Sequence, residues 1–325
     1  MGDVKIKMQW EKPKVYAVKN INETVRMSSR SGGIFPALSD TILEEQGVVY
    51  GCILNEKFEA VHVRADNKTE RDKMCGSKYV QSKMGDTYKK VKLDLQSDKK
   101  VLFSGTSCQV AGLKAFLGKE YDNLLCVDIV CHGVPSLKVW KKYIRWQESR
   151  NHAKVIEVNF RNKKDFGWRE HVERLRFDNN KVVDAWIFKT LFSSNVILRP
   201  SCYKCLYKSI MHPGDITIAD YWGIEKAALE FDDNKGVSLV LINNQNGENE
   251  FEKVKDRVKW KQTKIEDSMQ PALIKPFERP ENREKFWQDF ENDTFDSIAK
   301  EYGGYTFSNK IKYKLKKEKQ RLMKR

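Results

Sequence analysis

Short apolar runs alternate with amphipathic segments along the first half of the chain. Residues 15–18, 48–54 and 60–63 have the length and composition typical of short, partly buried strands. Between the first two, apolar side chains recur every four positions over residues 34–42, as they do on one face of a helix. The pattern therefore predicts strands and helices that follow one another closely.

The ends of this helix carry their own signals. Ser31 is expected to be the N-cap, and Gly47 is expected to end the helix in the manner of a C′ glycine. A second helix is predicted over residues 86–96, where apolar residues return at helical spacing.

Two strand-turn-helix units come next. Residues 100–118 and 124–147 each begin with an apolar run, pass through a turn and continue as a helical pattern. Successive units of this kind favour a mainly parallel sheet, in which ligands bind beyond the carboxyl ends of the strands. Cys108 and Cys131 both lie at that predicted edge.

Beyond residue 150 the pattern changes to alternating polar and apolar positions. Residues 155–161, 171–177 and 181–186 resemble antiparallel strands, residues 215–220 and 237–243 add two more strands, and the remainder is expected to be helical and charged. The predicted fold class is α/β, with a mainly parallel sheet and flanking helices, an antiparallel β-rich second lobe and a basic C-terminal tail.

Charge is concentrated at one end of the chain. The 325 residues carry a formal charge of +15, and residues 310–325 contain nine Lys or Arg against one Glu, a net +8. A solubilising or weakly helical tail is the leading interpretation, and an acidic protein or an anionic membrane surface is the next. No nucleic-acid-binding motif is present, so nucleic acid is not an expected partner.

Membrane and secretory signals are missing from the pattern. No run of eighteen apolar residues occurs, and the first residues have no apolar core of a signal peptide. The seven cysteines are an odd number spread thinly, unlike a secreted disulfide framework. These features lead us to expect a cytoplasmic protein with reduced thiols.

The cysteine spacing leaves several kinds of site open. Cys202 and Cys205 form a CxxC between two prolines, and Cys108 and Cys131 stand far from this pair. Four thiolates that converge from separate loops suit a 4Fe-4S cluster, whereas structural zinc and ordinary cysteines remain alternatives. Cys52 and Cys126 lie in apolar strands and are expected to be core residues, and Cys75 is a weaker fifth candidate ligand.

Small-residue turns give a second signal. The segments 28–33, 75–82 and 104–109 combine Gly, Ser and Thr with little side-chain bulk, so their backbone N–H groups could donate hydrogen bonds to phosphate oxygens. None has the spacing of a GxGxxG or P-loop motif, and tight packing of the turns explains them equally well.

These segments, in this order, resemble the beta-subunit family of deazaflavin (coenzyme F420) hydrogenases and dehydrogenases. The resemblance covers residues 14–290 and is carried by the following segments: SSRSGGIF, VVYG, GSKYVQS, VLFSGTSCQVAGLKAFL, VDIVCHGVPS, FRNKKDFGW, LRPSCYKC, DITIADYWG and KGVSLVLIN. The family includes flavoproteins with FAD and 4Fe-4S clusters, and many bacterial members occur in a polysaccharide-biosynthesis setting.

The resemblance implies roles for individual residues. The implied metal ligands are Cys108, Cys131, Cys202 and Cys205. The implied flavin contacts are Ser31, Gly32, Gly33, Ser77, Lys78, Tyr79, Gly105, Thr106 and Gln109. It also implies a division into a polar leader (1–13), an N-terminal flavin-site lobe (14–95), a C-terminal-type lobe with the iron–sulfur site (96–300) and the basic tail (301–325).

The sequence departs from the family pattern in three respects. No cysteine-rich, ferredoxin-like run precedes Met8, so the electron-entry module is expected to reside on another protein or to be missing. Ser107 stands where relatives commonly have proline, which should loosen that turn but leave the thiol of Cys108. Arg30 and Ala219 replace small residues usual at those positions, and we expect that Arg30 can reach a flavin phosphate.

The resemblance implies an FAD- and 4Fe-4S-dependent oxidoreductase. It would pass electrons between an external donor such as a ferredoxin, its cluster, FAD and a small-molecule acceptor, in a cell-surface polysaccharide pathway. The alternative is a noncatalytic adaptor with a structural four-cysteine metal site and a basic tail that docks on a partner.

Overall fold

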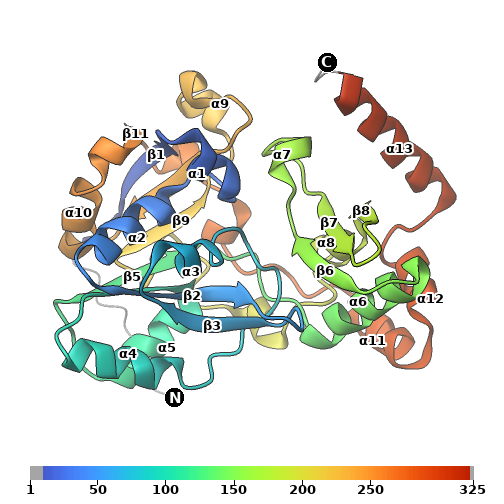
Figure 1. Cartoon of the computed structure of the whole chain (residues 1–325), viewed down its shortest axis with the longest axis horizontal. Coiled ribbons are helices and arrows are strands. Elements are labelled where there is room, and N and C mark those ends of the chain that lie inside the picture. Colours follow the sequence, from blue (N-terminus) through green and yellow to red (C-terminus); the bar gives the residue numbers. More distant parts are fainter. Residues whose placement is uncertain (1–9, 323–325) are drawn as a thin grey trace. The chain divides into compact units, whose positions relative to one another are not determined.

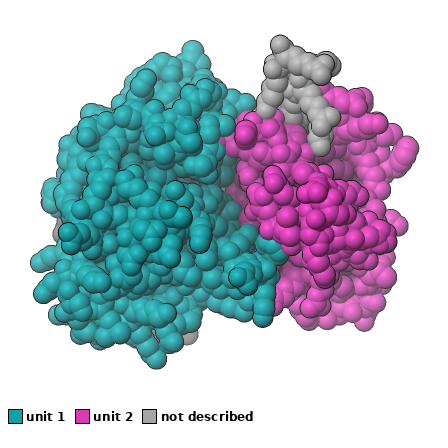
Figure 2. Space-filling view, viewed as in Figure 1, with its two compact units in different colours: residues 1–78, 82–132, 204–276 teal, residues 79–81, 133–203, 277–325 magenta. Residues whose placement is uncertain are grey.

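The computed structural model describes residues 10–322, so part of the predicted leader (residues 1–9) and the last three residues of the tail lie outside the described residues. The chain forms two compact units (Figure 2). Unit 1 comprises residues 1–78, 82–132 and 204–276, and unit 2 comprises residues 79–81, 133–203 and 277–325. The predicted boundary after residue 95 falls inside unit 1, so the predicted lobes and the compact units divide the chain differently.

An eight-stranded sheet forms the centre of unit 1, with the order β11-β1-β10-β9-β5-β4-β2-β3. Its strands are β1 (Lys14–Asn20), β2 (Val48–Leu54), β3 (Ala60–Ala65), β4 (Val101–Thr106), β5 (Leu124–Ile129), β9 (Ile216–Asp220), β10 (Ser238–Ile242) and β11 (Val258–Thr263). The four central strands β9, β5, β4 and β2 pair in parallel, and antiparallel strands extend the sheet on both sides.

Side chains of the central strands alternate between two hydrophobic cores. Phe103 points into the core beneath α4 (Thr87–Gln96) and α5 (Ser107–Leu117), and its neighbour Leu102 points into the core beneath α2 (Ile34–Glu44) and α10 (Gln245–Glu252). Both side chains are fully buried, as the period of two in a strand requires when helices cover both faces. Figure 1 shows α2 and the pair α4 and α5 on opposite faces of this sheet.

Short elements complete unit 1. They are α1 (Glu23–Ser28), α3 (Lys68–Asp72), α9 (Ile224–Ala227), η2 (Leu229–Phe231), η3 (Lys255–Arg257), η4 (Glu266–Ser268) and η5 (Pro271–Leu273).

Unit 2 combines a small antiparallel sheet with helices. The sheet has the order β6-β7-β8, formed by β6 (Val155–Asn159), β7 (Glu173–Phe177) and β8 (Val182–Ala185). The helices are α6 (Leu137–Asn151), α7 (Lys163–Phe166), α8 (Ile187–Ser193), α11 (Arg283–Asn292), α12 (Phe295–Glu301) and α13 (Phe307–Leu322). Their core is aromatic: Trp140 lies 4.8 Å from Phe160 and 4.7 Å from Phe188 between ring centroids. The 3-10 helix η1 (Pro200–Lys204) lies at the end of the segment 133–203 of this unit.

The predicted fold class is confirmed, with a parallel centre of one sheet and a separate antiparallel sheet. Three local predictions were wrong. The N-cap of α2 is Gly33 rather than Ser31, and the left-handed residue after this helix is Gln46 rather than Gly47. The segment 258–263, expected to belong to a helical region, is the edge strand β11.

No helix among residues 10–322 is long and apolar enough to cross a bilayer.

Replacing Phe103 by Ala should lower the free energy of unfolding by about 3–5 kcal/mol, because the truncation leaves a cavity in a core that cannot fully collapse. The matched control is Phe116→Ala, since Phe116 is 43% exposed on the neighbouring helix whereas Phe103 is 0% exposed. Urea denaturation followed by circular dichroism measures both variants. Equal losses of stability would contradict the layered core.

Candidate functional site

Two predicted cysteine ligands lie at one edge of the sheet in unit 1. β4 and β5 pair in parallel and in register up to Thr106 and Ile129, so both strands end at the same edge. Cys108 is exposed in the first turn of α5, and Cys131 is half-buried two residues beyond β5. The Thr106 hydroxyl lies 3.1 Å from the Cys108 sulfur. The strand-end placement predicted from sequence is therefore confirmed.

Cys205 is connected to the same edge by its downstream neighbours. The buried Lys208 donates from Nζ to the carbonyl oxygen of His132 at 2.7 Å, which ties the segment after Cys205 to the residue after Cys131. Burial raises the pKa of Tyr207, and the negative charges of Cys108 and Cys205 raise it further. These two sulfurs therefore act on the same phenol.

Cys202 belongs to unit 2. It lies in the 3-10 helix η1, and its sulfur accepts a hydrogen bond from the backbone N–H of Val134 at 3.4 Å. Over the residues that the structure describes, no group of three or more His, Cys, Asp or Glu side chains is gathered as a metal site. The four-cysteine ligand set therefore stays a prediction.

The donor set nevertheless has the chemistry of an iron–sulfur site. Thiolates are the usual ligands of 4Fe-4S clusters, and N–H or O–H groups directed at the sulfurs are the means by which proteins adjust such clusters. The Val134 N–H is such a group for Cys202, and the Thr106 hydroxyl lies within hydrogen-bond distance of the Cys108 sulfur. Cys126, by contrast, is fully buried and its thiol pKa is raised well above the usual value by burial, as expected for a core residue.

The first predicted flavin segment, residues 31–33, makes hydrogen bonds within the fold. Ser31 donates from its hydroxyl to the carbonyl oxygen of Val237, and the N–H of Gly32 donates to the Ser238 hydroxyl at 2.9 Å. A Cβ on Gly32 would lie 2.1 Å from the carbonyl oxygen of Val18, so this glycine is required by close approach to β1. Packing of the turn, one of the two sequence interpretations, accounts for these residues without a ligand.

Thr106 and Gln109 close the N-terminus of α5 as a capping box. Oε1 of Gln109 accepts from the Thr106 N–H at 2.9 Å, and the Gln109 amide donates to the Ser82 hydroxyl at 2.9 Å. A Cβ on Gly105 would lie 3.1 Å from the same Oε1. These predicted flavin contacts are brought together, and their polar groups are engaged with one another.

This chain of hydrogen bonds continues to His62, which sequence reasoning missed. The ring Nε2 lies 3.0 Å from the carbonyl oxygen of Ser104, so Nε2 carries the proton, and Nδ1 accepts from the Ser82 hydroxyl at 2.7 Å. Burial lowers the pKa of His62 to about 4. The ring is therefore neutral and in one tautomer. No local sequence pattern predicts this role of His62, because its hydrogen-bond partners come from distant segments of the chain.

The segment 77–79 is divided between the units. Lys78, at the end of unit 1, donates from Nζ to the carbonyl oxygens of Lys73 and Cys75, and burial lowers its pKa to about 8. Tyr79 belongs to unit 2, where its ring lies 5.0 Å from His171. Ser77 is half-buried beside Lys78.

Arg30 is engaged by a carboxylate of this chain. Its guanidinium pairs with Asp220 at 2.7 Å and lies 5.9 Å from the ring centroid of Trp222. Asp220 therefore balances the charge of Arg30, and the expectation that Arg30 reaches a flavin phosphate stays a prediction.

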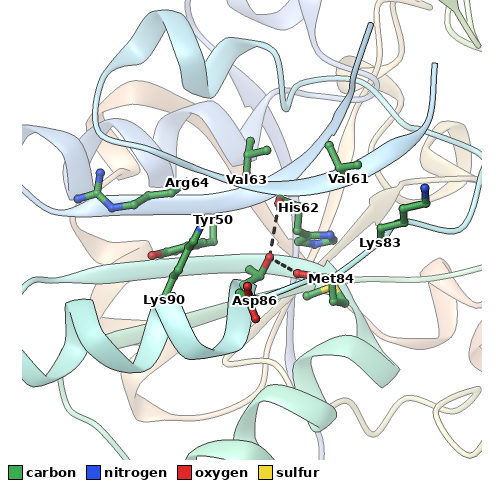
Figure 3. Close-up of a pocket in the computed structure, with 11 residues that line it drawn as sticks. Tyr50, Val61, His62, Val63, Arg64, Lys83, Met84, Asp86 and Lys90 are labelled. Atoms are coloured by element: carbon green, nitrogen blue, oxygen red, sulfur yellow. Dashed lines mark hydrogen bonds between the residues drawn. The ribbon is translucent and has the colours of Figure 1, made fainter. Parts of the chain in front are cut away.

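A pocket of about 430 Å³ opens on unit 1 beside His62 (Figure 3). Figure 3 shows Arg64 and Lys83 toward opposite ends, with Tyr50 and His62 between them. Lys83 pairs with Glu59 at 2.6 Å, and Arg64 pairs with Asp94 at 2.9 Å. None of the nine predicted flavin residues lines this pocket.

A second buried polar cluster adjoins Cys108 and was also missed from sequence. His212 and Asp128 are both buried, and Nδ1 of His212 lies 3.1 Å from Oδ2 of Asp128 and 3.0 Å from the Ser107 hydroxyl. Thr217 donates to the other oxygen of Asp128 at 2.6 Å. The cluster fixes the turn that carries Cys108 to the adjacent strands β5 and β9.

Acidification should weaken the fold through His62. Its pKa is about 4 in the folded chain and about 6.5 when unfolded, so the unfolded chain binds more protons between these values. The stabilisation is complete above pH 6.5 and is lost as the pH falls to 4, by roughly 3 kcal/mol. Because burial raises the pKa of Glu173 to about 7, that carboxyl acts in the opposite direction over much of this window. The measurement is therefore the difference between wild type and His62→Gln in urea denaturation from pH 7 to 4. Parallel pH profiles would refute the role of His62.

Substituting Gly32 should destabilise the protein even when no flavin is present. A Cβ there would meet backbone atoms of two strands, so Gly32→Ala is expected to cost about 1–3 kcal/mol or more. The control is Gly118→Ala. Gly118 has a left-handed backbone conformation, but no atom lies within 4 Å of an added Cβ, so this substitution should cost only the backbone strain of about 1 kcal/mol. Thermal unfolding of flavin-free protein compares the two. An unchanged Gly32→Ala protein would remove the packing explanation.

Comparison with known proteins adds family membership and fold. Residues 98–268, more than half of the chain, match the family model that describes the C-terminal part of the coenzyme F420 hydrogenase/dehydrogenase beta subunit. No curated protein sequence matches.

Among solved structures, the F420-reducing [NiFe] hydrogenase complex from Methanosarcina barkeri contains a chain with a TM-score of 0.53 and 17% identity. The match covers 95% of this chain and 97% of that chain, and it indicates a shared fold. The chain therefore belongs to the coenzyme F420 hydrogenase/dehydrogenase beta-subunit family, a family of oxidoreductase subunits.

Proposed function

We propose that this chain is an oxidoreductase that carries one 4Fe-4S cluster and FAD and passes electrons between them and a small organic acceptor. The observation that carries the proposal is the gathering of Cys108, Cys131 and the segment after Cys205 at one carboxyl edge of the sheet in unit 1. The family to which the chain belongs supports the redox class.

The proposed ligands are Cys108, Cys131, Cys202 and Cys205. A cluster would supply one-electron chemistry, and a flavin would convert between one-electron and two-electron chemistry. The chain's own contribution would be the four thiolates that hold the cluster. The Val134 N–H, which donates to the Cys202 sulfur, supports this role.

The FAD part of the proposal rests on the resemblance. Most of the predicted contacts use their polar groups within the fold, and Ser31 and Gln109 are examples. Lys78 offers the best support, because an amine with a pKa near 8 is charged at neutral pH and would suit a phosphate. Its two present acceptors are backbone carbonyls, which a phosphate could replace.

Further parts of the proposal concern the cellular setting. A ferredoxin-like protein is the proposed electron donor, the acceptor is proposed to be a small molecule of cell-surface polysaccharide biosynthesis, and the compartment is proposed to be the cytoplasm. Nucleic acid is not among the proposed partners.

The proposal is tested by the metal content of anaerobically purified or reconstituted protein. We expect about four iron and four sulfide per chain, together with bound FAD released on denaturation. Cys202→Ser and Cys205→Ser should each lose most of the iron, because a four-thiolate site cannot close without either ligand.

The matched control is Cys52→Ser. Cys52 is half-buried, its sulfur lies 3.7 Å from the carbonyl oxygen of Ile53, and it is not a proposed ligand, so the iron content should be unchanged. Protein that holds zinc in place of iron, and no flavin after reconstitution, would refute the redox function and favour a structural metal site.

A further inference from the structure

The C-terminal helix α13 presents a row of apolar side chains to solvent. Phe307, Ile311 and Leu315 are 79%, 45% and 60% exposed, respectively, although large apolar side chains in a folded helix are usually covered. Their spacing of four places them on one face of the helix, one turn after another. Figure 1 shows α13 in red at the C-terminal end of unit 2.

The opposite face of α13 packs against the rest of unit 2. The Tyr313 ring stacks on Trp186 with centroids 4.2 Å apart, and Nζ of Lys310 lies 3.7 Å from the centroid of Tyr305. Position 313 lies about 200° around the helix from Ile311 at 100° per residue. The packing of α13 against the rest of unit 2 therefore leaves the row of Phe307, Ile311 and Leu315 uncovered.

Positive charge flanks this row. Lys312 and Lys314 are exposed and lie on either side of the apolar face, and residues 310–325 carry a net +8 with Glu318 as their single acid. A narrow apolar row between basic side chains is the pattern of helices that lie in a membrane interface, where the apolar groups enter between lipids and the lysines reach the anionic headgroups.

We propose that α13 binds the surface of an anionic lipid bilayer. Phe307, Ile311 and Leu315 enter the boundary between headgroups and acyl chains, and Lys312 and Lys314 contact anionic headgroups. A lipid surface fits this helix better than an acidic protein does, because a bilayer uses the lysines and the apolar row together along the helix, whereas an acidic surface uses only the lysines. In the proposed orientation the helix axis runs along the membrane surface.

Co-sedimentation of the full-length protein with vesicles tests the proposal. We expect binding to vesicles of phosphatidylcholine with about 30% phosphatidylglycerol, and at least about tenfold weaker binding to phosphatidylcholine alone. Lys312→Gln/Lys314→Gln should weaken binding to the anionic vesicles by about tenfold or more, because each lysine near the surface contributes separately. Ile311→Gln/Leu315→Gln should weaken it by a similar factor through loss of apolar insertion.

The charge-matched control is Lys57→Gln/Lys300→Gln, which removes two exposed lysines elsewhere and should bind like wild type. Circular dichroism verifies that each variant is folded. Equal binding to both vesicle types would overturn the proposal, as would full binding by the Ile311→Gln/Leu315→Gln protein, since attraction of charge alone explains that result. Failure of wild type to bind anionic vesicles, with binding to soluble polyglutamate instead, would assign the helix to an acidic protein partner.

Discussion

The parallel pairing of β4 with β5 is the constraint on which the rest of unit 1 depends. Parallel neighbours with helices on both faces must alternate their side chains between two cores, as Leu102 and Phe103 do. The same pairing makes adjacent strands end together, so whatever follows them is gathered at one edge. Cys108 and Cys131 lie there because of strand register, before any ligand contributes. The buried cluster around Asp128 then fixes the turn in place, and its hydrogen bonds cross from α5 to β9.

Sequence predicted the strand-turn-helix units and this edge because both depend on local periodicity. It failed where a tertiary contact decided the outcome. Gly47 is a glycine because a Cβ would lie 2.5 Å from the carbonyl oxygen of Lys100, so packing rather than a left-handed turn explains it. β11 was missed because only Val258 of its first five residues is buried, which leaves little apolar signal. His62 was missed because its partners, Ser82 and Ser104, come from segments far away in the chain.

The small-residue turns illustrate how one sequence signal can serve two purposes. Glycines and hydroxyls before a helix suit phosphate binding, yet here they also let the backbone of Gly32 approach two strands and let Gln109 cap α5. A ligand at these positions would have to compete with existing hydrogen bonds or use the remaining surface. Sequence cannot separate these cases, because the same residue types satisfy both. The cysteines are different, since Cys108 is exposed and Cys131, Cys202 and Cys205 are only partly buried, unlike the core residue Cys126.

The edge strand β11 also limits what else can join the sheet. An edge strand carries backbone groups that another chain could pair with, and uncovered edges promote aggregation. Lys259 and Lys261 are exposed on this strand, and an incoming strand would have to bury or displace their charges. The two lysines therefore disfavour the addition of a further strand at this edge, and they protect it without the cover of a helix or loop.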